Sequence, residues 1–290
     1  MASGVAAGAR PGRRRAPLDR WALLAVPGVG FLLVFFGYPL LELVLVSVRD
    51  PGPENYLIFA ESPVYARVLA TTFRTALVVT AICLLLGYPY AYMLHRSSRR
   101  TAAVLAALVL LPFWSSLLVR TYAWVVLLQD SGVINGLLTS LGLIGSPLPL
   151  IRNTLGVTLG MSQILLPFMV LPLWAAMRRI DWDLTRAAAG MGAGPFTAFR
   201  RVFLPLSLPG VYAGSLLVFV LALGFYITPA VLGSPRDALL SELVVNQVTR
   251  QLQFGVGSAL GVVLLVATLL VLAVGSRFAK VGQAVGYEDS

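Results

Sequence analysis

Few side chains in this sequence have the chemistry of a catalytic or metal site. His95 is the single histidine and Cys83 the single cysteine in 290 residues, which excludes a metal centre built from several such ligands. The chain also lacks the G-x-x-x-x-G-K-[ST] loop that binds the phosphates of ATP, and no apolar run holds a pair of carboxylates. We therefore expect no catalytic residue, no metal and no cofactor, so the energy for any uphill work must come from a partner.

One polar segment, 181–205, has a pattern that suggests contact with another protein. Asp181 or Asp183 can cap a short helix, and the glycine-rich turn 190–194 ends it before a proline. A second short helix over 196–203 then has one apolar face at helical spacing. That face consists of Phe196, Phe199, Val202 and Phe203, with Arg200 and Arg201 beside it and Pro205 stopping the helix. The pattern predicts either a docking surface for a partner or an amphipathic connector that lies on lipid headgroups.

The elements that must position this segment are apolar helices. Hydrophobic residues make up 58% of the chain, charged residues only 12%, and the mean hydropathy is +0.85. A soluble domain has about 25% charged residues and could not bury this much apolar surface. Since about 20 apolar residues span the hydrocarbon core, we predict an all-α polytopic membrane protein with six transmembrane helices and the polar segment between the fourth and the fifth. The spans are about 22–47, 70–94, 102–127, 154–176, 209–232 and 257–276.

Three regions follow from these runs. Residues 1–20 hold five arginines and are expected to form a basic, disordered tail. Residues 21–280 form the transmembrane domain, and 281–290 form a second tail. The first apolar run is longer than the roughly 7–15 residues of a signal peptide, so we expect it to remain as an uncleaved first helix.

The arginines predict how the chain lies in the membrane. Of the 22 Arg and Lys residues, 15 fall in the two tails and in the loops after the second and fourth spans. The other side has seven, which seven Asp and Glu residues cancel. Because basic residues resist translocation, both termini and the segment 181–205 are expected in the cytoplasm of a bacterium, with the chain in its inner membrane. Arginines placed at membrane ends also argue against nucleic acid as a partner.

The segment 181–205 resembles the EAA loop of ABC-importer permeases, whose pattern is E-A-A-x-x-x-G-x-x-x-x-x-x-F-x-x-[VI]-x-L-P. The residues in register are Ala187, Ala188, Gly192, Phe199, Val202, Leu204 and Pro205. Arg186 stands where the family has glutamate, so an ion pair of that glutamate does not transfer to this chain. The resemblance implies a coupling helix that sits in a groove of a cytoplasmic ATPase, with Gly192 at the turn and with Phe199 and Val202 as docking contacts.

Further stretches resemble the spermidine/putrescine subgroup of these permeases, and the likeness covers roughly residues 20–280. They are 113–124, 132–138, 166–172 and 224–233. The resemblance implies a permease subunit that forms half of an import path for a small organic solute, a polyamine in that subgroup. It also implies three partners, namely an ABC ATPase dimer, a second permease subunit and an extracytoplasmic solute-binding protein, which act together by ATP-driven alternating access.

A polycation would need carboxylates and aromatic faces along its path. The candidates are Glu42, Trp114, Tyr122, Trp124, Asp130, Phe225, Tyr226 and Glu242. The aromatics could equally form an interfacial belt, and the carboxylates could be solvated loop charges. Arg120 is the charged residue that lies most clearly within a predicted span. We favour a structural role for it, either pairing with a carboxylate or capping carbonyl groups. Because it would repel a cation, an anionic or zwitterionic solute, such as a phosphonate or an amino-acid conjugate, remains an alternative cargo.

Two other classes of protein remain open for an apolar chain with six spans. An ATP-independent secondary transporter or channel would couple transport to intramembrane ionisable residues, and a membrane-embedded assembly subunit would have no path at all. The EAA-type loop argues against the first class. Association with an ATPase that solute-loaded binding protein stimulates would separate all three.

Overall fold

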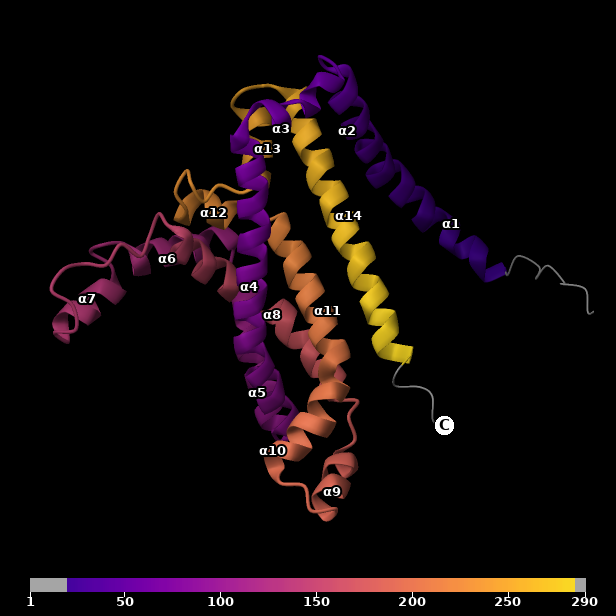
Figure 1. Ribbon diagram of the computed structural model, residues 1–290, viewed down its shortest axis with the longest axis vertical. Helices are drawn as coiled ribbons and strands as arrows, with labels where there is room; N and C mark the ends of the chain where they lie inside the picture. The colour runs from indigo at the N-terminus through magenta and orange to yellow at the C-terminus, as the bar shows by residue number, and fades with distance from the viewer. Residues whose placement is uncertain (1–19, 285–290) are drawn as a thin grey trace, which may run out of the picture.

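The fold is a bundle of long helices. The computed structural model of the protein describes residues 20–284, so the predicted tail 1–20 lies outside the described part of the chain except for Arg20, and of the predicted tail 281–290 residues 281–284 are described and continue the last helix. All regular elements within 20–284 are helical (Figure 1). Six helical stretches there are long and apolar enough to cross a membrane, which confirms the prediction of an all-α protein with six spans. They are Val26–Arg49, Pro63–Arg96, Leu117–Ser140, Thr154–Met177, Pro195–Leu223 and Phe254–Arg277.

Three helices form the centre of the bundle: α4 (Pro63–Arg96), α8 (Thr154–Met177) and α11 (Leu204–Leu223). Two glycines on α11 let it approach α8 closely. A Cβ on Gly210 would lie 2.6 Å from the Cβ of Ala176, and a Cβ on Gly214 would lie 2.8 Å from the Sδ of Met169. Small residues at such a contact allow the dispersion contacts that hold membrane helices together. α14 (Phe254–Ala284) packs against α11 on the outside of this centre.

The first span consists of α1 (Arg20–Leu32), a π turn η1 (Leu33–Gly37) and α2 (Tyr38–Arg49). The π turn ends just before Pro39, which occupies the first turn of α2 and therefore needs no backbone N–H there. α2 packs against α14, whereas α1 diverges from the bundle (Figure 1).

The run 102–127, predicted as one continuous third span, is interrupted in the structure. It contains most of α5 (Arg99–Leu110), a 3₁₀ turn η3 (Leu111–Trp114) and α6 (Leu117–Leu128), so the third membrane-length stretch begins only after the break, at Leu117. Pro112 ends the α-helical hydrogen bonding, and the Ser115 hydroxyl donates to its carbonyl at 2.8 Å. After this break α6 and the following α7 (Val133–Ser140) extend sideways from the bundle (Figure 1).

The fifth span ends earlier than the predicted 209–232. α11 stops at Leu223, residues 224–226 are non-helical, and a short helix α12 (Ile227–Leu232) follows. Gly224 is the residue at which the helix ends, and glycine is the usual residue beyond a helix C-terminus. Both interruptions lie within apolar runs, where a hydropathy profile shows no change.

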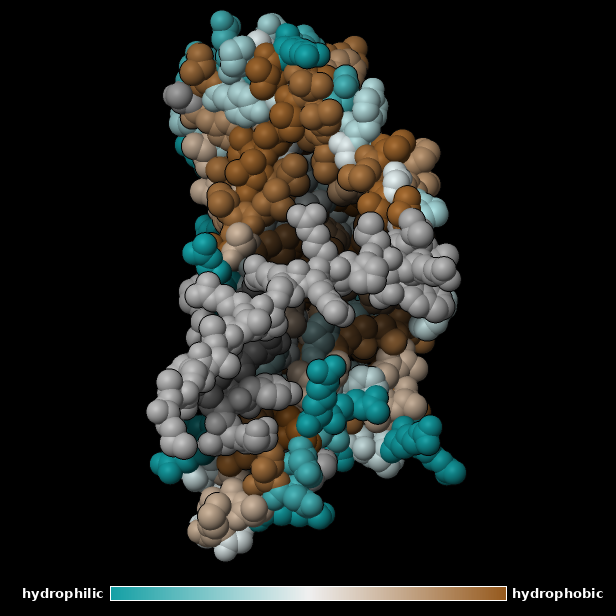
Figure 2. Space-filling model, turned by 90° about the vertical axis from the view of Figure 1, so that its right-hand side faces the viewer, coloured by the Kyte–Doolittle hydropathy of each residue, from teal (hydrophilic) through white to brown (hydrophobic). Residues whose placement is uncertain are grey.

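The two ends of the bundle carry different short elements. One end, here named the α9 end, holds α9 (Trp182–Gly190), α10 (Pro195–Ala198) and a π turn η4 (Phe199–Phe203). The opposite end, named the α13 end, holds η2 (Pro53–Tyr56), α3 (Ile58–Glu61) and α13 (Leu240–Thr249). Figure 2 shows apolar residues filling much of the surface between polar residues at the two ends, as expected of a chain that faces lipid along its sides.

The helix predicted over 196–203 does not stop at Pro205. η4 runs directly into α11, and Pro205 lies in the first turn of that helix. The π turn changes the hydrogen-bond register just before the proline, which lets the chain stay helical through a residue without an N–H.

Candidate functional site

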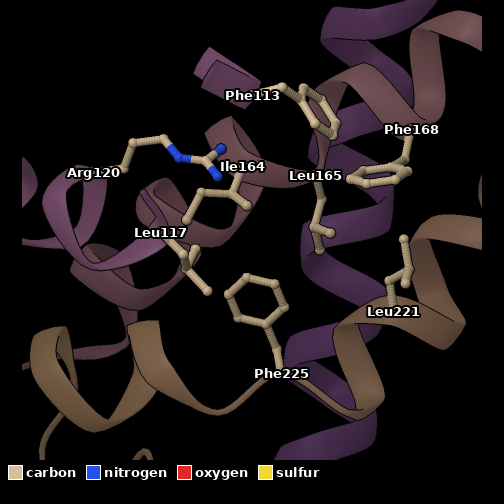
Figure 3. A pocket seen from close by; sticks show the side chains of 8 residues that line it. All are labelled: Phe113, Leu117, Arg120, Ile164, Leu165, Phe168, Leu221 and Phe225. Atoms are coloured by element: carbon tan, nitrogen blue, oxygen red, sulfur yellow. The ribbon is translucent and has the colours of Figure 1, made fainter. Parts of the chain in front are cut away.

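A cavity of about 220 Å³ lies where the two interrupted spans meet α8. η3 and α6 provide one wall, α8 the second, and the end of α11 with the following turn the third (Figure 3). The lining is Phe113, Leu117, Arg120, Ile164, Leu165, Phe168, Leu221 and Phe225. The cavity is thus apolar and aromatic apart from one guanidinium group.

The helix breaks explain why these side chains meet. Ser115 and Ser116 have extended backbones, so α6 begins beside the cavity and its first turn presents Leu117 and Arg120. Phe225 lies in the non-helical turn after α11 and reaches the cavity from the other side (Figure 3). Discontinuous membrane helices commonly form the solute sites of transporters, since a helix terminus exposes its backbone groups there.

Arg120 is the one charged residue of the lining. It is half-buried, and its Nε atom is shielded from solvent without a hydrogen-bond partner in the described part of the chain. Figure 3 shows the guanidinium group extending from α6 toward Ile164 of α8. The carboxylate partner expected for Arg120 is not found among the described residues, because no Asp or Glu lines the cavity.

The structure brings only some of the predicted path residues to this region. Phe225 lines the cavity, and Trp124 is half-buried on α6, where its Nε1 donates to the Oε1 of Gln163 at 3.4 Å. Tyr226 is half-buried and precedes α12. The other candidates are exposed on the surface of the single chain: Trp114 at 82%, Tyr122 at 59%, and Asp130 and Glu42.

Glu242 lies on α13 and is linked to the cavity through its neighbour. The Ser241 hydroxyl donates to the carbonyl of Phe225 at 2.5 Å, which ties α13 to the turn that carries the Phe225 ring. Burial raises the pKa of Glu242, and the charge of Arg250 opposes this in part. Glu242 is thus the one half-buried carboxylate among the predicted path residues.

Sequence reasoning missed most of the cavity lining. Phe113, Leu117 and Phe168 come from three different elements, and none of them differs in type from ordinary lipid-facing residues. The available signal was the Ser115–Ser116 pair inside an apolar run, since adjacent serines after a proline favour a break over a continuous helix.

At the α9 end the predicted segment packs partly onto its own chain. Phe199 and Phe203 of η4 contact the Tyr92 ring edge-on, with ring centroids 5.5 Å and 5.0 Å apart. Tyr88, one turn away on α4, contacts Phe199 at 6.2 Å and shares a hydrogen bond with Ser207 of α11 at 2.8 Å. We name these four aromatic residues the ring cluster; it joins the segment to α4.

The turn between α9 and η4 is the most exposed apolar part of this segment. Met191 is 83% exposed and Phe196 is 73% exposed. Gly192 between them has φ +87°, a left-handed conformation that favours glycine. Arg186 pairs with Asp183 at 3.5 Å, and both side chains are exposed. Of the other predicted residues, Ala188 is buried, Val202 and Leu204 are half-buried, and Ala187 and Pro205 are exposed.

Comparison with known proteins gives consistent matches over most of the chain. The profile of a family described as "Binding-protein-dependent transport system inner membrane component" matches residues 101–281. The spermidine/putrescine transport system permease protein PotB of Haemophilus influenzae is 33% identical over 251 residues, covering 83% of this chain and 88% of that protein. PotB of Escherichia coli is 31% identical over 255 residues, covering 85% and 93%.

A solved structure shares the fold. A chain of a bacterial alginate ABC transporter, crystallised with a periplasmic protein that holds an alginate pentasaccharide, superposes with a TM-score of 0.70. The two chains are 20% identical, and the match covers 89% of this chain and 94% of the other.

Proposed function

The chain belongs to the family of binding-protein-dependent transport system inner membrane components, and on that premise we propose that it forms half of the path of an ATP-driven importer for a polyamine such as spermidine or putrescine. It is a transport subunit of the inner membrane rather than an enzyme. The observation that carries the choice of solute is the similarity to PotB, which extends over most of both chains.

The α9 end faces the cytoplasm, and with it both termini. Arginines from α4, α5, α9, η4 and the turn after α8 gather near this end, and the positive-inside rule assigns such a side to the cytoplasm. They are Arg96, Arg99, Arg100, Arg178, Arg179, Arg186, Arg200 and Arg201.

The turn around Gly192 docks onto a cytoplasmic ATPase. Met191 and Phe196 support this role because both are largely exposed apolar side chains at the α9 end of the bundle. Exposed apolar groups rimmed by arginines are typical of a protein interface. Phe199 and Val202, the contacts that the family pattern implies, complete the docking surface at its edge.

The ring cluster carries movement of this surface into the spans. Phe199 and Phe203 contact Tyr92 of α4, and η4 continues into α11, so a displacement of the turn reaches two central helices. Closure of the ATPase dimer then moves the spans relative to those of a second permease subunit, and the path opens alternately to each side. A solute-binding protein outside the membrane delivers the solute to the α13 end.

The test is uptake of labelled spermidine by the complete transporter with Gly192→Asp. We expect no measurable uptake and no ATPase in the purified complex, while the variant chain still inserts in the membrane. Asp places a charge in the centre of the docking surface and takes the place of glycine at φ +87°. Gly194→Asp is the matched control, since Gly194 is exposed, precedes α10 and suits an N-cap aspartate.

The experiment tests two parts of the proposal independently: coupling through the turn around Gly192, and the polyamine as the solute. Normal uptake by Gly192→Asp refutes coupling through the turn. Wild-type transporter whose ATPase is stimulated by its binding protein, but which takes up no spermidine, refutes the polyamine and leaves the importer role in place.

One observation favours a second solute class. The cavity contains a guanidinium group and no carboxylate, a lining that attracts an oxyanion and repels an amine. An anionic or zwitterionic solute, such as a phosphonate or an amino-acid conjugate, is therefore the second candidate cargo.

A further inference from the structure

Arg120 poses an electrostatic problem within this chain. A charged side chain in the membrane region costs at least about 2.5 kcal/mol even by the most lenient scales, unless it is paired or hydrated. Its Nε is shielded from solvent and has no hydrogen-bond partner among the described residues. Five of the eight lining residues are aliphatic or aromatic side chains on α8 and α11 or just after it, and these offer no acceptor.

Three carboxylates of this chain could be considered as partners of Arg120, but each lies elsewhere or has other partners. Asp130 follows the far end of α6, ten residues away, which along a helix is about 15 Å. Asp237 accepts hydrogen bonds from Thr154 and Ser234, both at 2.5 Å. Glu242 lies on α13, where Arg250 is the charge that acts on it.

The helix that carries Arg120 adds to the positive potential. α6 has 12 residues, and its first turn, with free backbone N–H groups, begins beside the cavity. The N-terminus of a helix has a partial positive charge, which favours an anion. Phe113, Phe168 and Phe225 give the cavity apolar walls, and an apolar surrounding strengthens an ion pair formed there.

We propose that this cavity receives an oxyanion supplied by another molecule, which pairs with the guanidinium group of Arg120. The group is a carboxylate or a phosphonate, whose two oxygens match the fork of donors that arginine presents. It comes either from the solute or from an acidic residue of the second permease subunit. The inference rests on the proposed importer function, because that function brings both molecules to the cavity.

The two sources have different structural consequences. A solute anion would occupy the cavity only during transport. An acidic residue of the second subunit would occupy it in the resting transporter and hold the two permeases together beside α6, where Val119 and Tyr122 are exposed on this chain.

The first experiment separates the charge of Arg120 from its shape. Arg120→Lys keeps the charge, Arg120→Met keeps a similar length without it, and Arg236→Met removes an arginine from an exposed turn as the control. In the complete transporter we expect the Arg120→Lys variant to keep at least about a third of the wild-type uptake rate. The Arg120→Met variant should lose about tenfold or more, because it leaves the partner of a buried ion pair without its counter-charge. The proposal is overturned if Arg120→Met has the wild-type uptake rate, or if Arg120→Lys and Arg120→Met lose the same share of that rate.

The second experiment identifies the source. The amount of second permease that co-purifies with Arg120→Met is compared with wild type in the absence of solute. In parallel, phenylglyoxal modification of Arg120 is followed by peptide mass spectrometry without solute, with spermidine and with 2-aminoethylphosphonate. Loss of the second subunit from Arg120→Met, with Arg120 protected in the wild type before any solute is added, assigns the anion to that subunit.

An intact pair of permeases, with Arg120 protected about fivefold or more by the phosphonate but not by spermidine, assigns the anion to the solute. Arg120 that is modified as readily as exposed Arg236 under every condition overturns the proposal. Uptake by the wild-type transporter is the reference throughout, so a wild type that transports nothing argues against the proposed function and not against the site.

Discussion

Two parts of the molecule are joined by different kinds of side-chain contact. Away from the α9 end, hydrogen bonds join loops to helices: Asp237, just before α13, binds Thr154 and Ser234, and Asn135 on the sideways α7 donates to the carbonyl of Leu148 and accepts from its N–H. At the α9 end the junction is the ring cluster. Hydrogen bonds weaken steeply with angle and distance, whereas ring contacts tolerate several geometries between 4.5 and about 7 Å.

This difference agrees with what an importer subunit must do at each end. In the proposed importer the α9 end follows a moving ATPase, and ring contacts can slide without losing all their energy. In the same proposal the α13 end keeps the mouth of the path in a fixed shape for a binding protein. We therefore infer that the α9 end is the mobile junction and the α13 end the rigid one.

The largest effect is expected for Phe203→Ala, which tests whether the ring cluster holds the α9 end. Phe203 is 2% exposed and contacts Tyr92 and Phe199. Its truncation should destabilise the chain by about 3–5 kcal/mol, measured as a lower melting temperature of the purified transporter. Phe196→Ala is the matched control in the same segment: because Phe196 is 73% exposed, stability should change by less than about 0.5 kcal/mol.

Phe196→Ala should nevertheless weaken association with the ATPase, since Phe196 belongs to the proposed docking surface. Phe203 is expected to hold elements of this chain together, and Phe196 to face a partner. Equal changes in melting temperature for Phe203→Ala and Phe196→Ala would contradict this distinction.

A smaller effect is expected for Asn135→Ala on α7. Asn135 is 1% exposed; its amide makes two hydrogen bonds with Leu148, which anchor the loop after α7, and donates a third to the carbonyl of Gln129 before α7. The loss should be about 1–2 kcal/mol, with faster hydrogen exchange confined to residues 141–150. Ser140→Ala, which removes an exposed local hydrogen bond, should leave this exchange unchanged. If exchange rises equally at the α9 end, the two ends are not independent.

The smallest effects are expected for two carboxylates of the α13 end, and they have opposite signs. Burial raises the pKa of Glu242, so its contribution to stability is present at low pH and is lost as the pH rises through that pKa. Burial also acts on Asp237, but hydrogen bonds from Ser234 and Thr154 outweigh it and lower the pKa. The contribution of Asp237 is present near neutrality and is lost as the pH falls through its pKa.

Glu242→Gln should therefore raise the melting temperature at about pH 7, and Asp237→Asn should lower it, each by no more than about 2 °C. The difference for Glu242→Gln should disappear at about pH 3, where wild-type Glu242 is protonated, and the difference for Asp237→Asn should shrink only as the pH falls through the lowered pKa of Asp237. A melting temperature that rises for Asp237→Asn at neutral pH would show that its hydrogen bonds do not stabilise this end.

Hydropathy was sufficient to predict the helical class and the number of spans, because an apolar run of about 20 residues has few other structures open to it in a membrane. It could not reveal the breaks at Ser115–Ser116 and at Gly224, since both lie inside apolar runs. The cavity depends on those breaks and therefore could not be predicted from hydropathy; the Ser115–Ser116 pair was the one local signal. The spacing around Gly192 predicted a turn, and the structure has a left-handed glycine there.

Helical periodicity likewise could not predict which phenylalanines of the segment 181–205 are buried and which are exposed. Phe196, Phe199 and Phe203 share one predicted face, but a face does not tell which neighbour covers it. The packing of α4 decides this, because Tyr92 covers Phe203 and Phe199 and leaves Phe196 exposed.

From Pro195 to Leu223 the chain is a single helical rod, with the π turn inside it. A flexible connector at this point would not transmit rotation. A continuous helix does, so that rotation of its exposed end about the helix axis also rotates the rest of the span. Leu221 lies near the far end, about 40 Å from Phe196 along the axis. In the proposed importer, Leu221 beside the cavity would thus turn together with Phe196 at the ATPase, in addition to the movement that the ring cluster passes to α4.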